Sequence, residues 1–66
     1  MDNMKSQQFN SDDEAISYIE NMGKVKYYGR DGEGFKTLIY TCTIGSVIYQ
    51  ISIRDGYLKV FHIRYE

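Results

Sequence analysis

The sequence predicts an α+β fold in which one short N-terminal helix packs on a four-stranded antiparallel β-meander with strand order 1-2-3-4. The dipeptides Gly45-Ser46 and Asp55-Gly56 predict the sheet, because each separates runs rich in β-branched and aromatic residues. Two-residue turns of this kind need positive φ angles, which glycine adopts easily. Three strands follow from these turns: Thr37–Ile44, Val47–Arg54 and Tyr57–Tyr65.

A two-residue turn also sets the register of its hairpin, so pairs can be counted outward from each turn. The first turn pairs Tyr40 with Ile51, and the second pairs Ile51 with Val60 and Tyr49 with His62. Both counts place the same residues of the middle strand on one face, which we call face A and expect to be the core side. Face A is predicted to carry Val25, Tyr27, Leu38, Tyr40, Cys42, Ile44, Val47, Tyr49, Ile51, Ile53, Leu58, Val60 and His62. The opposite face, face B, is predicted to include Lys24, Lys26, Tyr28, Phe35, Ile48, Arg54, Tyr57, Lys59, Phe61, Ile63 and Tyr65.

An N-terminal helix is predicted over residues 12–22. Ser11 and Glu14 have the spacing of a capping box, in which each side chain bonds the other residue's backbone N–H, and Gly23 ends the helix. Its apolar stripe consists of Ala15, Ile16, Ile19 and Met22. Residues 1–10 are expected to be flexible, so that residues 11–66 form a single domain.

Residues 24–28 are predicted to form the first strand, which a glycine-rich connection joins to the next one. With residues 31–32 at the tip of this hairpin, Val25 pairs with Leu38 and Tyr28 with Phe35. A helix of eleven residues is about 16 Å long and about 10 Å across, whereas the sheet is roughly 15–20 Å wide and 25 Å long. The helix therefore cannot cover face A alone.

Size and composition exclude several classes of protein. A 66-residue chain with one cysteine and one histidine has no internal disulfide and no ordinary zinc site. No apolar run is long enough for a membrane span and no signal peptide is recognised, so a cytoplasmic protein is expected. Residues 1–23 carry five acidic residues and one basic residue, whereas residues 24–66 carry seven basic and four acidic residues. A core this small favours oligomerisation or a partner as additional support.

Catalytic, cofactor-binding and metal-binding residues are not predicted. Cys42 and His62 share one cross-strand row, but Tyr49 separates them, which puts their backbones about 9–10 Å apart. A catalytic pair needs hydrogen-bond contact. The glycine-rich loop lies between two strands, whereas familiar phosphate-binding loops open a helix. An enzyme is therefore the least favoured class.

The favoured function is a non-enzymatic protein–protein interaction module, because the predicted fourth strand is long and leaves an unprotected edge. Small chains of this kind are often accessory or inhibitory proteins, including those of bacteriophages and mobile elements. The expected partner is a second copy of the chain, a larger protein, or both, and a dimer could form edge to edge or face to face. The residues predicted to bind the partner are Ile48, Tyr57, Lys59, Phe61, Ile63 and Tyr65.

The alternative function is binding of single-stranded nucleic acid on face B, where cations and aromatic rings are interleaved. The slight acidity of the whole chain speaks against it, because dedicated nucleic-acid binders are usually basic. The predicted patch consists of Lys24, Lys26, Tyr28, Phe35, Arg54 and Lys59.

Overall fold

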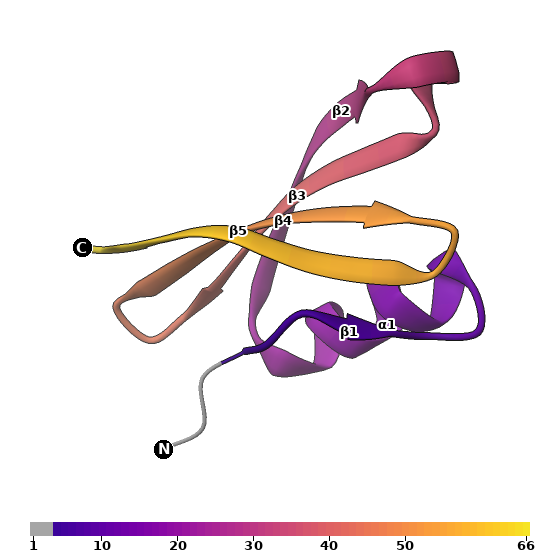
Figure 1. Cartoon of the computed structure of the whole chain (residues 1–66). Coiled ribbons are helices and arrows are strands. Elements are labelled where there is room, and N and C mark those ends of the chain that lie inside the picture. Colours follow the sequence, from indigo (N-terminus) through magenta and orange to yellow (C-terminus); the bar gives the residue numbers. More distant parts are fainter. Residues whose placement is uncertain (1–3) are drawn as a thin grey trace.

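One helix, five strands and a short 3-10 turn make up residues 4–66, the part of the chain that this computed structural model describes (Figure 1). They follow the chain as β1 (Gln7–Gln8), α1 (Asp12–Met22), β2 (Lys24–Asp31), η1 (Glu33–Phe35), β3 (Thr37–Ile44), β4 (Val47–Arg54) and β5 (Tyr57–Tyr65). The strands form one antiparallel sheet in the order β1-β5-β4-β3-β2. The α+β class with an antiparallel sheet is confirmed. The prediction of four strands is wrong, because β1 adds a fifth strand beside β5.

The hairpin of β3 and β4 has the predicted register throughout, with Tyr40 opposite Ile51. The two predicted turns contain positive φ angles, 62° at Gly45, 50° at Asp55 and 78° at Gly56. These turns therefore set the register locally, as their composition indicates.

The register of β4 and β5 is as predicted only near the turn, where Ile51 lies opposite Val60. A β-bulge follows, so that Gln50 rather than Tyr49 lies opposite His62, and Phe61 is the extra residue. A one-residue bulge moves every later side chain of the strand to the other face. The predicted pairing of Tyr49 with His62 is therefore wrong, and the face assignments of β5 are wrong beyond the bulge.

The predicted register of β2 and β3 is wrong by four residues. Val25 lies opposite Cys42 rather than Leu38, and a bulge interrupts the ladder at Tyr28. The first strand is also longer than predicted, because β2 extends to Asp31, and η1 rather than a two-residue tip makes the connection. Val25 and Tyr27 still lie on face A, since the offset of four is even.

Helix α1 has the predicted bounds and lies against face A (Figure 1). The Ser11 hydroxyl accepts a hydrogen bond from the Glu14 N–H at 3.2 Å, as the capping box requires. The Glu14 carboxylate, however, accepts from the Asn10 N–H at 3.1 Å instead of the Ser11 N–H. The helix ends at Gly23, where a β-carbon would overlap the carbonyl oxygen of Thr43. Glycine therefore lets the helix end lie directly on β3.

The core lies between face A, α1 and the N-terminal segment. Its buried residues are Met4, Ala15, Ile19, Leu38, Cys42, Tyr49, Ile51, Ile53 and Leu58. Met22, predicted on the apolar stripe of the helix, is 37% exposed. As expected from its size, the helix leaves part of face A open, because Tyr27 is 51% exposed.

The N-terminal segment holds the turn between β4 and β5. The Phe9 N–H donates to the Gly56 carbonyl at 2.8 Å, and the Phe9 ring packs 5.2 Å from the Tyr18 ring. The Asp12 carboxylate accepts a hydrogen bond of 2.6 Å from the Gly56 N–H. Within the segment that was expected to be flexible, residues 6–9 thus bond to the sheet and Met4 belongs to the core, whereas residues 1–3 lie outside the described part.

Candidate interaction surfaces on the sheet

The outer edge of β5 is covered by β1 along only half of its length. Gln7 and Gln8 pair with Leu58 and Tyr57. The Ser6 hydroxyl then accepts a hydrogen bond of 2.9 Å from the Val60 N–H. Beyond this point, β5 pairs only with β4 among the described residues. Figure 1 shows this half of β5 running toward the C-terminus, past α1 and β1.

The free half of β5, which we define as residues 61–65, directs backbone hydrogen-bonding groups outward. The Glu66 N–H donates to the Ser46 carbonyl at 2.8 Å, so this pair faces inward, toward β4. Hydrogen-bonded and non-hydrogen-bonded pairs alternate along an antiparallel ladder. The N–H and C=O groups of Ile63 and Tyr65 therefore point away from β4, toward an open edge.

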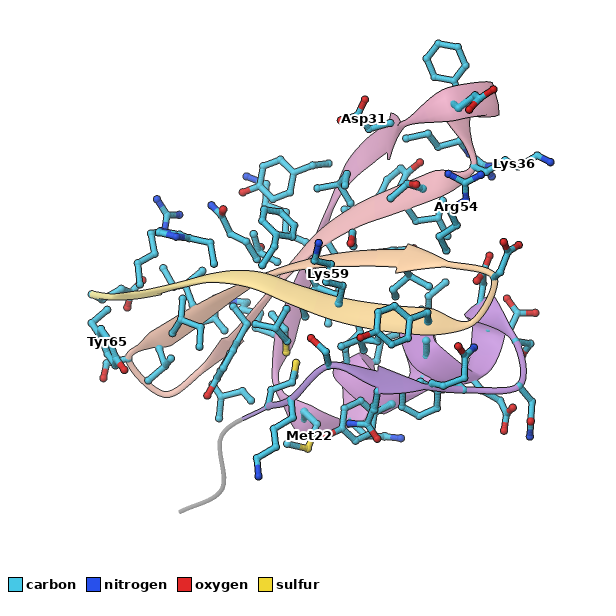
Figure 2. The ribbon with its side chains drawn as sticks, viewed as in Figure 1. Met22, Asp31, Lys36, Arg54, Lys59 and Tyr65 are labelled. Carbon is cyan, nitrogen blue, oxygen red and sulfur yellow. The ribbon has the colours of Figure 1, made fainter. Side chains whose placement is uncertain are left out.

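All five residues of this free half are exposed. Phe61 is 48% exposed, Ile63 40% and Tyr65 75%. Because of the bulge, Ile63 lies opposite Tyr49 and Tyr65 opposite Val47, so both belong to face A. Figure 2 shows Tyr65 at the end of β5 that is remote from Arg54.

The predicted partner-binding set is therefore divided. Ile48 and Phe61 remain on face B, as predicted, but Ile63 and Tyr65 lie on face A, so the predicted apolar members do not share one face. The other two members, Tyr57 and Lys59, lie in the half of β5 next to β1.

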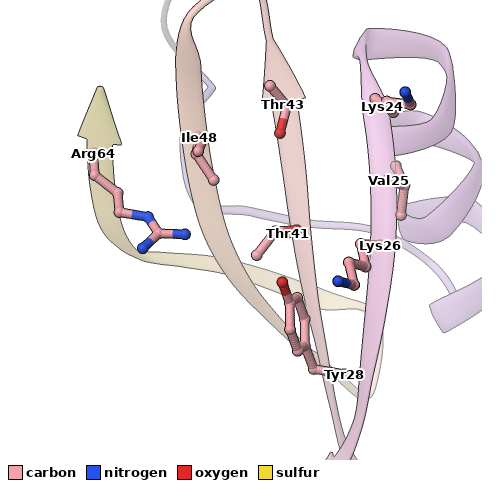
Figure 3. Close-up of a pocket in the computed structure, with 8 residues that line it drawn as sticks. All are labelled: Lys24, Val25, Lys26, Tyr28, Thr41, Thr43, Ile48 and Arg64. Carbon is pink, nitrogen blue, oxygen red and sulfur yellow. The ribbon is translucent and has the colours of Figure 1, made fainter. Parts of the chain in front are cut away.

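A second surface is a groove across face B, formed by two adjoining hollows of about 330 Å³ each. The first hollow is lined by Lys24, Val25, Lys26, Tyr28, Thr41, Thr43, Ile48 and Arg64 (Figure 3). The second hollow is lined by Tyr28, Ile39, Tyr40, Thr41, Gln50, Phe61 and Arg64. Because the hollows share Tyr28, Thr41 and Arg64, they form one surface from β2 to β5, which we call the face B groove.

Two cationic side chains lie on opposite sides of the face B groove. Figure 3 shows the amine of Lys26 and the guanidinium of Arg64 directed toward each other from the two sides, with the Tyr28 hydroxyl between them. The Lys26 amine also lies 5.3 Å from the centre of the Tyr28 ring, within the range of a cation–π contact. The arrangement presents positive charge beside an exposed aromatic ring.

The predicted nucleic-acid patch is only partly assembled. Lys24, Lys26 and Tyr28 come together in the face B groove. The other three residues lie elsewhere: Phe35 is in η1, Lys59 lies opposite Ser52, and Arg54 lies opposite Tyr57. The four-residue error in the register of β2 explains this separation, since it corresponds to about 13 Å along a strand.

Sequence reasoning missed Arg64, because counting outward from the Asp55-Gly56 turn pairs it with Val47 and so places it on face A. The bulge at Phe61 turns Arg64 to face B, opposite Ile48. No local sequence signal marks this bulge, and only the pairing of β5 with β4 reveals it.

Cys42 and His62 lie on opposite faces of the sheet, because Cys42 is opposite Tyr49 whereas His62 is opposite Gln50. The Cys42 thiol is fully buried and donates a hydrogen bond of 3.3 Å to the Ile19 carbonyl. Burial raises the pKa of this thiol. The prediction that Cys42 and His62 share face A is therefore wrong, and the sheet lies between the two side chains.

Within residues 4–66, the His, Cys, Asp and Glu side chains form no group of three or more suited to a metal ion. In the same part of the chain, no helix has the length and apolar character that crossing a membrane requires. Comparison with family models, with curated proteins and with solved structures finds no match to this chain.

Proposed function

We propose that the protein is a non-enzymatic protein–protein interaction module that binds an extended segment of a partner by strand addition to residues 61–65 of β5. The observation that carries this proposal is the direction of the Ile63 and Tyr65 backbone groups, which face an edge that no described strand covers. An added strand would satisfy these groups and bury the exposed side chains beside them.

The side chains of the free half of β5 define the chemistry of the partner segment. Arg64 and His62 lie on the face B side, and Ile63 and Tyr65 lie on the face A side. Opposite charges across neighbouring strands stabilise a sheet, as do apolar pairs. The partner segment should therefore alternate between acidic side chains on one face and apolar or aromatic side chains on the other.

A second copy of the chain fits this edge less well than an acidic segment. Two-fold antiparallel pairing centred on Arg64 would place the two guanidinium groups opposite each other. Pairing centred on Ile63 would place the His62 imidazole, rather than a carboxylate, opposite Arg64. Like charges directly opposite each other are destabilising. A different protein is therefore the favoured partner. The homodimer stays a prediction, which sedimentation of the wild-type chain at tens of micromolar tests.

Selection from a random peptide library displayed on phage tests the strand-addition proposal. We expect enrichment of peptides that alternate acidic with apolar residues. Proline at Ile63 should abolish their binding, because it removes an outward N–H while the inward ladder with β4 is retained. The matched control is alanine at Ile63, which keeps the N–H and should retain most of the binding. Selected peptides that bind Ile63→Pro as tightly as wild type would refute strand addition.

A further inference from the structure

We propose that the face B groove binds single-stranded nucleic acid, with phosphate groups held between Lys26 and Arg64 and bases stacked on the rings of Tyr28 and Phe61. This activity goes beyond the proposed protein binding, because it uses the open face of the sheet rather than the outer edge of β5. Three properties of the groove support it: its charge, the exposure of its aromatic rings, and its position across the sheet.

The charge of the groove is exclusively positive among the described residues. Lys26 and Arg64 point into the first hollow, Lys24 adds a third cation to its lining, and no carboxylate lines either hollow (Figure 3). The chain as a whole has a net charge of −1, whereas three of its eight basic residues and none of its acidic residues line this groove. Such a concentration favours an anionic ligand and supplies the phosphate contacts that dominate nucleic-acid affinity.

The aromatic rings distinguish a nucleic acid from a simple anion. Tyr28 is 56% exposed and Phe61 is 48% exposed, and both line the second hollow next to Arg64. Exposed rings beside cations on an open sheet are the arrangement by which proteins hold unpaired bases and their phosphates. Hydroxyl groups of Thr41 and Thr43 add hydrogen-bonding capacity to the floor of the groove.

The position of the groove fits an extended strand rather than a duplex. It runs from β2, at one edge of the sheet, to β5, so a ligand would cross the strands and meet cations at both ends of its path. A single strand can turn its bases onto the rings while its phosphates meet the cations. In a duplex the bases are stacked on each other and are not available to Tyr28 or Phe61.

Fluorescence anisotropy with end-labelled eight-nucleotide single strands of DNA and RNA, in mixed sequence, tests the proposal. Two or three neutralised phosphates give a slope of about −1.4 to −2.1 in a plot of log affinity against log salt concentration. Affinity should thus fall roughly 7- to 18-fold between 50 and 200 mM salt. The same sequence as a duplex should bind more weakly.

Variants of the groove separate its two components. Lys26→Ala and Arg64→Ala should each weaken binding and reduce the magnitude of the salt slope by about 0.7. Tyr28→Ala should weaken binding about 5- to 160-fold, the range for loss of one stacked base, without changing the slope. The matched controls are Lys59→Ala and Arg54→Ala, which remove the same charges from the other end of face B and should change affinity less than twofold.

Three results would overturn the proposal. The first is an absence of binding to either single strand at 25 mM salt. The second is an equal loss for the control and groove variants, which would show that only overall charge matters. The third is displacement of the nucleic acid by an equal concentration of a polyglutamate peptide, which would assign the groove to acidic protein segments. Because Lys26 and Tyr28 lie on β2, their variants test the groove without altering the edge of β5.

Discussion

Replacement of Met4 with alanine tests whether the N-terminal segment is an integral part of the fold. Met4 is 3% exposed and belongs to the core, although it precedes every predicted element. Truncation of a buried methionine to alanine costs about 2–5 kcal/mol, through lost burial and the cavity left behind. A 66-residue domain has a total stability of roughly 3–10 kcal/mol. The substitution should therefore remove a large part of the free energy of unfolding.

Urea unfolding followed by far-UV circular dichroism and tyrosine fluorescence measures this loss. The matched control is Met22→Ala, which removes the same side chain from a position that is 37% exposed at the end of α1. It should cost less than about 1 kcal/mol, because alanine is also the better helix former. If Met4→Ala and Met22→Ala lower the urea midpoint equally, the N-terminal segment does not complete the core.

The remaining predictions concern the helix and the buried thiol. Gly23→Ala should lower the free energy of unfolding by about 1–3 kcal/mol, since the new methyl group would overlap the Thr43 carbonyl; an unchanged urea midpoint would contradict this close packing. Ser11→Ala should cost about 1 kcal/mol through loss of the N-cap bond, whereas Ser17→Ala at an exposed helical position should cost nothing. Equal midpoints for these two variants would argue against the cap. Burial raises the pKa of Cys42, so this thiol ionises at lower pH in the unfolded chain than in the folded one. The free energy of unfolding should therefore fall as pH rises above about 8.5, the ordinary pKa of a cysteine, and should show no such fall at lower pH. Comparison of urea midpoints at pH 7 and pH 9.5 checks this, and the fall should be smaller in Cys42→Ala; an equal fall would refute it.

The candidate surfaces were only partly predictable from the sequence. Exposed cations and rings on face B were recognised, as was the long edge strand. The members of each surface were not, because a bulge reverses the face of every residue after it. The extra residue at Phe61 places Arg64 on face B, in the groove, and places Ile63 and Tyr65 on face A, opposite to the predicted assignment.

The sequence by itself determined the elements whose signals are local. The β3–β4 register follows from a two-residue turn, and the bounds of α1 follow from Ser11 and Gly23. Only the tertiary structure decided the rest. The strand Gln7–Gln8 forms because it pairs with Leu58 and Tyr57, which lie about fifty residues further along the chain at the edge of the sheet. The bulges at Tyr28 and Phe61 arise where paired strands must accommodate an additional residue. Such features depend on contacts between distant segments, and neither composition nor periodicity within one segment encodes them.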